Sequence, residues 1–80
     1  MIALNDKELL YIISTGAVLP EILAKELEIS LFEAEVIFTR LENEGLIEKE
    51  EIHIPILNNP NAYKIRYLVT EAGIEYADLD

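Results

Sequence analysis

The sequence contains no cysteine and no tryptophan, and only three glycines and three prolines among its 80 residues. Without cysteine, neither a disulfide framework nor a thiolate metal site can form. No apolar run is long enough to span a membrane, and no basic segment precedes an apolar one at the N-terminus, so we expect neither a transmembrane helix nor a signal peptide. We therefore predict a cytoplasmic protein.

Basic residues are also scarce, because 6 Lys and Arg stand against 16 Asp and Glu, for a formal net charge of −10 at pH 7. Proteins that hold duplex DNA neutralise its phosphates with Lys and Arg, and their domains are usually basic. A chain this acidic repels a polyanion at long range. The acidic surface either only keeps a small protein soluble, or it serves a cationic partner or imitates a nucleic acid.

Apolar residues make up 51% of the chain, which is enough for one hydrophobic core at this length. We expect a single domain over residues 1–80. Asn5 and Glu8 form a capping-box pattern and predict a first helix over about 6–14. A proline at the first position predicts a second helix over about 20–27. Residues 17–19, between these helices, could pair as a brief edge strand with a later hairpin.

A third helix is predicted from Ser30, which forms a second capping box with Glu33, to about Glu44, where Gly45 ends it. Four of its apolar residues recur at the spacing of a buried helical stripe, namely Ala34, Ile37, Phe38 and Leu41.

Alternation of apolar and polar residues predicts two strands, over 47–57 and 63–69, joined by a turn at 58–61. Thr70 caps a last helix over about 71–79. The order of elements predicts an α+β fold: a small winged helix-turn-helix, with a three-helix core, a two- to three-stranded antiparallel wing and a short C-terminal helix.

Three segments carry a family resemblance: AKELEIS at 24–30, TRLENEGLIEK at 39–49 and YLVTEAG at 67–73. Over about residues 7–77 the chain resembles the winged-helix domain of MarR-like transcription regulators. The segments match the second helix and turn, the recognition helix running into the first wing strand, and the closing strand with its helix cap. The family's long terminal dimerisation helices have no counterpart here, so a homodimer would use another surface.

The resemblance also locates a departure in the turn between the second and third helices. The family commonly has glycine where this chain has Glu28. Either Glu28 adopts the left-handed conformation, at a cost of about 1 kcal/mol, or the turn has another shape.

In such regulators the third helix enters the major groove and the wing adds backbone contacts. The outer half of the third helix suits a different task, because Phe32 and Val36 cannot donate to base edges and two carboxylates would meet phosphates. An apolar centre with a charged rim is typical of a protein interface. We expect five residues to form it: Phe32, Glu33, Glu35, Val36 and Thr39. Alternatively, Phe32 and Val36 fold back as ordinary core.

The favoured function is therefore a regulator whose third helix docks on a basic protein of the transcription or replication machinery, or imitates DNA. The second hypothesis is a DNA-binding regulator led by the wing. Its contacts would be Arg40, His53, Lys64 and Arg66. We expect no enzyme, cofactor or metal site, because the single histidine has no nucleophile placed with it and no loop has the spacing of a metal or phosphate site.

Overall fold

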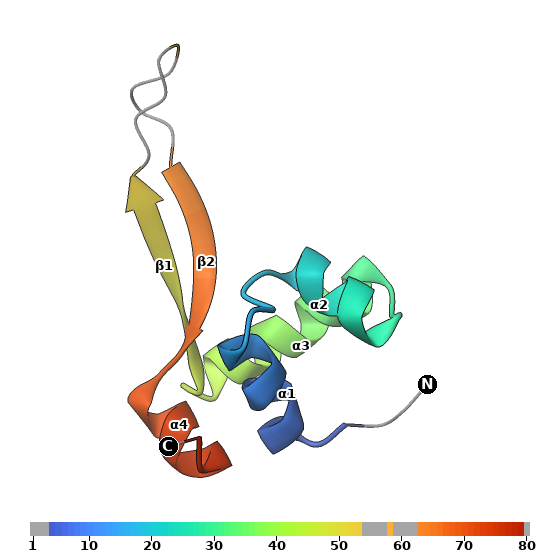
Figure 1. The fold of residues 1–80 in the computed structure, drawn as a ribbon, viewed down its shortest axis with the longest axis vertical. Coiled ribbons are helices and arrows are strands. Elements are labelled where there is room, and N and C mark those ends of the chain that lie inside the picture. Colours follow the sequence, from blue (N-terminus) through green and yellow to red (C-terminus); the bar gives the residue numbers. More distant parts are fainter. Residues whose placement is uncertain (1–3, 54–57, 59–62, 80) are drawn as a thin grey trace.

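The structure is a computed structural model that describes residues 4–53, 58 and 63–79. Its elements are α1 (Asp6–Ser14), α2 (Pro20–Leu27), α3 (Leu31–Asn43), β1 (Ile47–His53), β2 (Tyr63–Val69) and α4 (Glu71–Ala77). The fold is α+β, with four helices and one two-stranded antiparallel sheet among the described residues. The helices gather in one body, from which the two strands extend as an arm (Figure 1).

Side-chain capping sets where α1, α3 and α4 begin. The side chain of Asn5 accepts the amide of Glu8 at 2.9 Å, and Ser30 Oγ accepts the amide of Glu33 at 3.1 Å. Thr70 Oγ1 does the same for the amide of Gly73 at 3.1 Å. These bonds satisfy amides that have no partner within their own helix. The predicted helix starts are confirmed, whereas α4 ends at Ala77, two residues earlier than predicted.

The expected three-helix core is wrong, because α4 also closes the core. Gly73 in α4 is buried, and a Cβ there would overlap the carbonyl oxygen of Leu46 and lie 2.7 Å from Val69 Cγ1. Only glycine lets α4 approach the chain this closely. The buried apolar residues are Leu9, Leu10, Ile13, Ala17, Leu23, Ala34, Phe38, Leu41, Leu46 and Ile47.

The sheet is a hairpin in which Ile47 pairs with Val69 at one end and His53 pairs with Tyr63 at the other. The possible third strand at 17–19 does not form; a single backbone bond, from the Tyr67 amide to the Val18 carbonyl at 2.8 Å, joins that segment to β2. Of the predicted turn only Asn58 is described, and residues 54–57 and 59–61 lie outside the described ranges.

No helix within the described ranges has the length and apolar character needed to cross a membrane.

Glu28 takes the first of its two possible conformations. Its φ of 54° and ψ of 44° are left-handed, and its amide donates to the carbonyl of Ala24, so it caps α2 where the chain turns toward α3. A side chain in this conformation is strained, because its Cβ crowds the following carbonyl oxygen.

We expect Glu28→Gly to raise the free energy of unfolding by up to about 1 kcal/mol, because glycine adopts a positive φ without strain. Glu35→Gly, at an exposed position inside α3, is the matched control and should lower it by about 1 kcal/mol. Urea unfolding of both variants measures the difference in sign. A loss of stability in both would contradict the strained conformation of Glu28.

Candidate functional site

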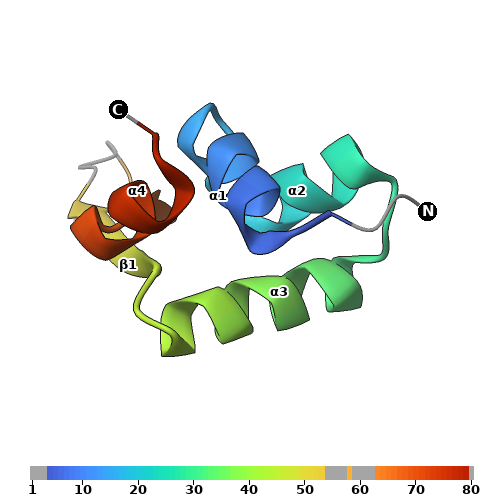
Figure 2. The ribbon, with the colours of Figure 1, turned by 90° about the horizontal axis from the view of Figure 1, so that it is seen from below.

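The third helix, α3, lies at the margin of the helical body. Figure 2 shows α1, α2 and α4 on one side of α3 and no element on the other. Ala34, Phe38 and Leu41 point toward the body and are buried. The opposite side of α3 is therefore open to whatever binds there.

Two large apolar side chains lie on this open side. Phe32 is 74% exposed and Val36 is 51% exposed, one helical turn apart. Neither folds back into the core. Full burial of a side chain of this size contributes about 1.5–3 kcal/mol of stabilisation. The isolated chain gains only part of this from Phe32 and Val36.

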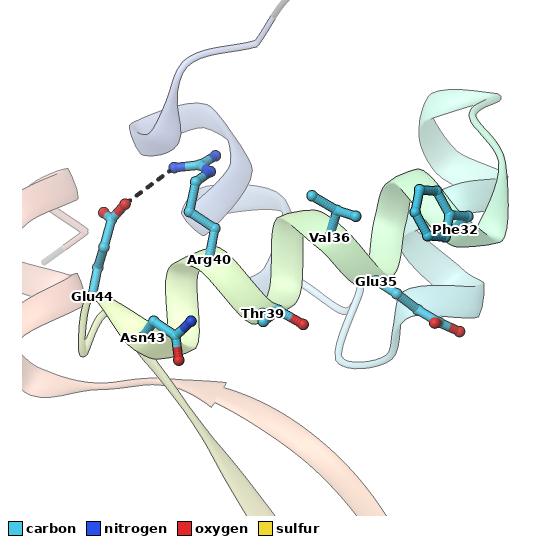
Figure 3. A pocket seen from close by; sticks show the side chains of 7 residues that line it. All are labelled: Phe32, Glu35, Val36, Thr39, Arg40, Asn43 and Glu44. Carbon is cyan, nitrogen blue, oxygen red and sulfur yellow. Dashed lines mark hydrogen bonds and ion pairs between the residues drawn. The ribbon is translucent and has the colours of Figure 1, made fainter.

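Phe32 and Val36 border a shallow groove of about 580 Å³, which we call the α3 groove. Its lining residues are Phe32, Glu35, Val36, Thr39, Arg40, Asn43 and Glu44 (Figure 3). They recur at steps of three and four residues, which places them on one side of a helix. The same periodicity that buries Phe38 therefore aligns these side chains along the solvent.

Four of the five residues predicted for a protein interface line the α3 groove, namely Phe32, Glu35, Val36 and Thr39. Glu33 does not line it. Its amide donates to Ser30 Oγ, and the Ser30 hydroxyl donates to Glu33 Oε1 at 3.3 Å, so Glu33 belongs to the start of the helix.

Arg40 is held away from the centre of the groove by two carboxylates. Its Nη1 and Nη2 each lie 2.9 Å from an oxygen of Asp6 in α1, and Nη1 lies 3.4 Å from Glu44 Oε1. The hydrogen bond that Arg40 donates to Asp6, more than the nearby negative charges, raises the pKa of Arg40 above its ordinary value, although partial burial opposes this. The guanidinium thus stays charged, and the stability that this raised pKa contributes is lost as the pH rises through it.

Arg66 also has an internal partner. Its Nε and Nη2 lie 2.9 and 2.8 Å from Glu50 Oε1, on the neighbouring strand. A phosphate would have to compete with this carboxylate for Arg66 and with Asp6 for Arg40. Lys64 and His53 are exposed at the outer part of the hairpin.

The four candidate nucleic-acid contacts do not share one surface. Tyr67 packs on Phe38 of α3, so Lys64 and Arg66, at alternating positions of β2, lie on the hairpin side turned away from the helices. His53 pairs with Tyr63 and therefore lies on the Tyr67 side. Arg40 is separate from all three, on α3 against α1.

Within the described ranges, no polar or charged side chain is buried, and no group of three His, Cys, Asp or Glu side chains could hold a metal ion.

Sequence reasoning missed three residues of the site. Asn43 and Glu44 continue the helical spacing of Phe32, Val36 and Thr39 by one turn, so the pattern contained a signal for them. Asp6 precedes Arg40 by 34 positions, and no local pattern links the two residues.

The contact between Asp6 and Arg40 should stabilise the fold modestly. A double-mutant cycle of Asp6→Asn and Arg40→Gln is expected to give a coupling of about 0.2–1 kcal/mol, since both side chains are partly exposed. The coupling should shrink in about 1 M NaCl. Lys25→Gln, at an exposed site on α2, is a control that should change stability little. A coupling of zero at low salt would contradict the ion pair.

No protein-family model matches this chain, and no curated protein matches it. Function is therefore inferred from the α3 groove, its two exposed apolar side chains and its carboxylates.

Proposed function

We propose that this chain is a winged-helix regulatory protein that acts by binding a basic protein through the α3 groove. The observation that supports it most is the exposure of Phe32 and Val36, one turn apart on α3, beside Glu35. Apolar side chains surrounded by a charged rim are the usual anatomy of a protein interface.

The order of the elements supports the assignment of this α+β fold as a winged helix-turn-helix. Two helices meet at the turn of Glu28, and the second of them, α3, is followed directly by a hairpin and a closing helix. This arrangement is compatible with a helix-turn-helix followed by a wing, and it supports the proposed likeness to MarR-like regulators over residues 7–77. Fold by itself does not assign a ligand.

The sign of the charge points to a cationic partner. The chain has a net charge of −10. At the α3 groove, Glu35 is exposed, and the one guanidinium, of Arg40, is already shared by Asp6 and Glu44. Complementary charge speeds association and rejects acidic competitors. A basic component of the transcription or replication machinery fits these requirements, and an acidic α3 could also occupy a nucleic-acid channel in place of DNA.

The second candidate is a DNA-binding regulator led by the wing. Lys64 and Arg66 on one side of β2 favour it, because from Ile52 to Val69 the sequence contains basic residues and no acid. The ion pair between Arg66 and Glu50 weakens this candidate, since it offsets one of those two charges.

A salt series with a mixed-sequence DNA duplex separates the two functions. We expect the chain to show no salt-dependent binding to this duplex near 0.1 M salt, because its acidic surface repels phosphates. Salt-dependent binding that is abolished by changing Lys64 and Arg66 to Glu would contradict docking on a protein.

Affinity capture from an extract of the source cells provides the second half of this test. Tyr11→Ser is the control, because it removes another exposed aromatic side chain. Columns of the wild-type chain and of this variant should retain the same basic protein. Columns of Phe32→Ser and Glu35→Lys should lose it. Retention by all four columns would show that the α3 groove is not the binding surface.

A further inference from the structure

We infer that the segment received by the α3 groove is itself an α-helix, with apolar anchor side chains on one face and Lys or Arg beside them. This inference rests on the proposed function and specifies the shape and chemistry of the partner's binding segment. It follows from the arrangement of side chains along the groove, from their heights and from their charges.

The lining side chains form two parallel rows, each with a step of four residues. One row contains Phe32, Val36, Arg40 and Glu44, and the other contains Glu35, Thr39 and Asn43. Figure 3 shows the two rows along α3. Rows with this step are the ridges that a second helix meets when two helices pack, and the channel between them accepts a ridge of that helix.

The length of the groove also suits a helix. From residue 32 to residue 44 it follows α3 for about 18 Å, at 1.5 Å per residue, which is slightly more than three turns. A helix that contacts it along this length presents three or four side chains on one face.

The middle of the groove is low enough for close packing. Val36 and Thr39 are short, and Arg40 is drawn toward Asp6 in α1, so it does not lie across the channel. Packed helices need a separation of about 8–10 Å between their axes. The contact between Asp6 and Arg40 thus keeps the channel open at its centre.

An extended segment has less to gain here. Strand addition derives its affinity from main-chain hydrogen bonds at a sheet edge. The amides and carbonyls in the middle of α3 are bonded within the helix, so they offer no such bonds to an extended chain. A helix brings its own main-chain bonds and needs only side-chain contacts.

Charge argues against a second copy of this chain as the occupant. Glu35 and Glu44 stand in opposite rows, and the guanidinium of Arg40 is taken by Asp6 and Glu44. Two copies packed through α3 would bring carboxylates together without free cations to offset them. A helix with Lys or Arg beside its apolar face meets Glu35 and Glu44 with opposite charge.

Three synthetic peptides of about 20 residues, long enough to form a helix on binding, test the inference. The first has leucines along one helical face flanked by lysines. The second is identical except that two central residues are replaced by proline, which prevents a helix. The third has glutamate in place of lysine. Each is titrated into the ¹⁵N-labelled full chain, and amide shifts give both the affinity and the position of binding.

We expect the first peptide to shift amides within residues 32–44 and to bind at least about tenfold more tightly than the other two. Phe32→Ser and Glu35→Lys should each weaken it about tenfold. Tyr11→Ser and Glu26→Lys are matched controls at exposed positions outside the groove. They should change its affinity less than about twofold, because surface charge alone acts weakly through solvent.

Equal binding of the proline peptide at residues 32–44 would overturn the helical occupant while leaving protein docking intact. The helical occupant would also be overturned if the first peptide did not bind, if it shifted amides outside residues 32–44, or if Phe32→Ser did not weaken its binding. Salt-dependent binding of the DNA duplex through Lys64 and Arg66 would instead overturn the proposed function, whatever the peptides do.

Discussion

The stack of Phe38 on Tyr67 is the contact on which the rest of the structure depends. Phe38 is almost fully buried, and its ring centre lies 4.8 Å from that of Tyr67 with the planes 17° apart. This contact holds the hairpin against α3, and it fixes the rotation of α3 about its own axis. Because Phe38 must face inward, Phe32 and Val36 face outward.

Like Phe38, two of the basic side chains are engaged by other residues of the fold. Arg40 and Arg66 each meet a carboxylate of this chain, on α1 and β1 respectively. These contacts stabilise the junctions between elements only modestly, but they reduce the positive charge available to a nucleic acid. The groove beside Phe32 therefore combines apolar contact area with acidic flanks, and helix packing and electrostatics favour the same kind of partner.

Much of the fold could be predicted from local chemistry. Capping residues and helical spacing predict the starts of α1 and α3, and the family's usual glycine at position 28 predicts, as one of two alternatives, the left-handed conformation that Glu28 adopts. The remainder depended on contacts between distant residues. Gly73 admits α4 against Leu46, and Asp6 meets Arg40, yet neither pairing leaves a periodic trace in the sequence. The exposure of Phe32 depended on how far α2 and α1 cover α3, which spacing alone does not determine.

The division of α3 into a structural side and a binding side is tested most directly by comparing Phe38→Ala with Phe32→Ala in urea unfolding. Phe38→Ala should lower the free energy of unfolding by about 3–5 kcal/mol, because it opens a cavity and removes the stack on Tyr67. Phe32→Ala should change it by less than about 0.5 kcal/mol, as expected for an exposed side chain. A loss of several kcal/mol for Phe32→Ala would place that ring in the core and contradict the binding surface.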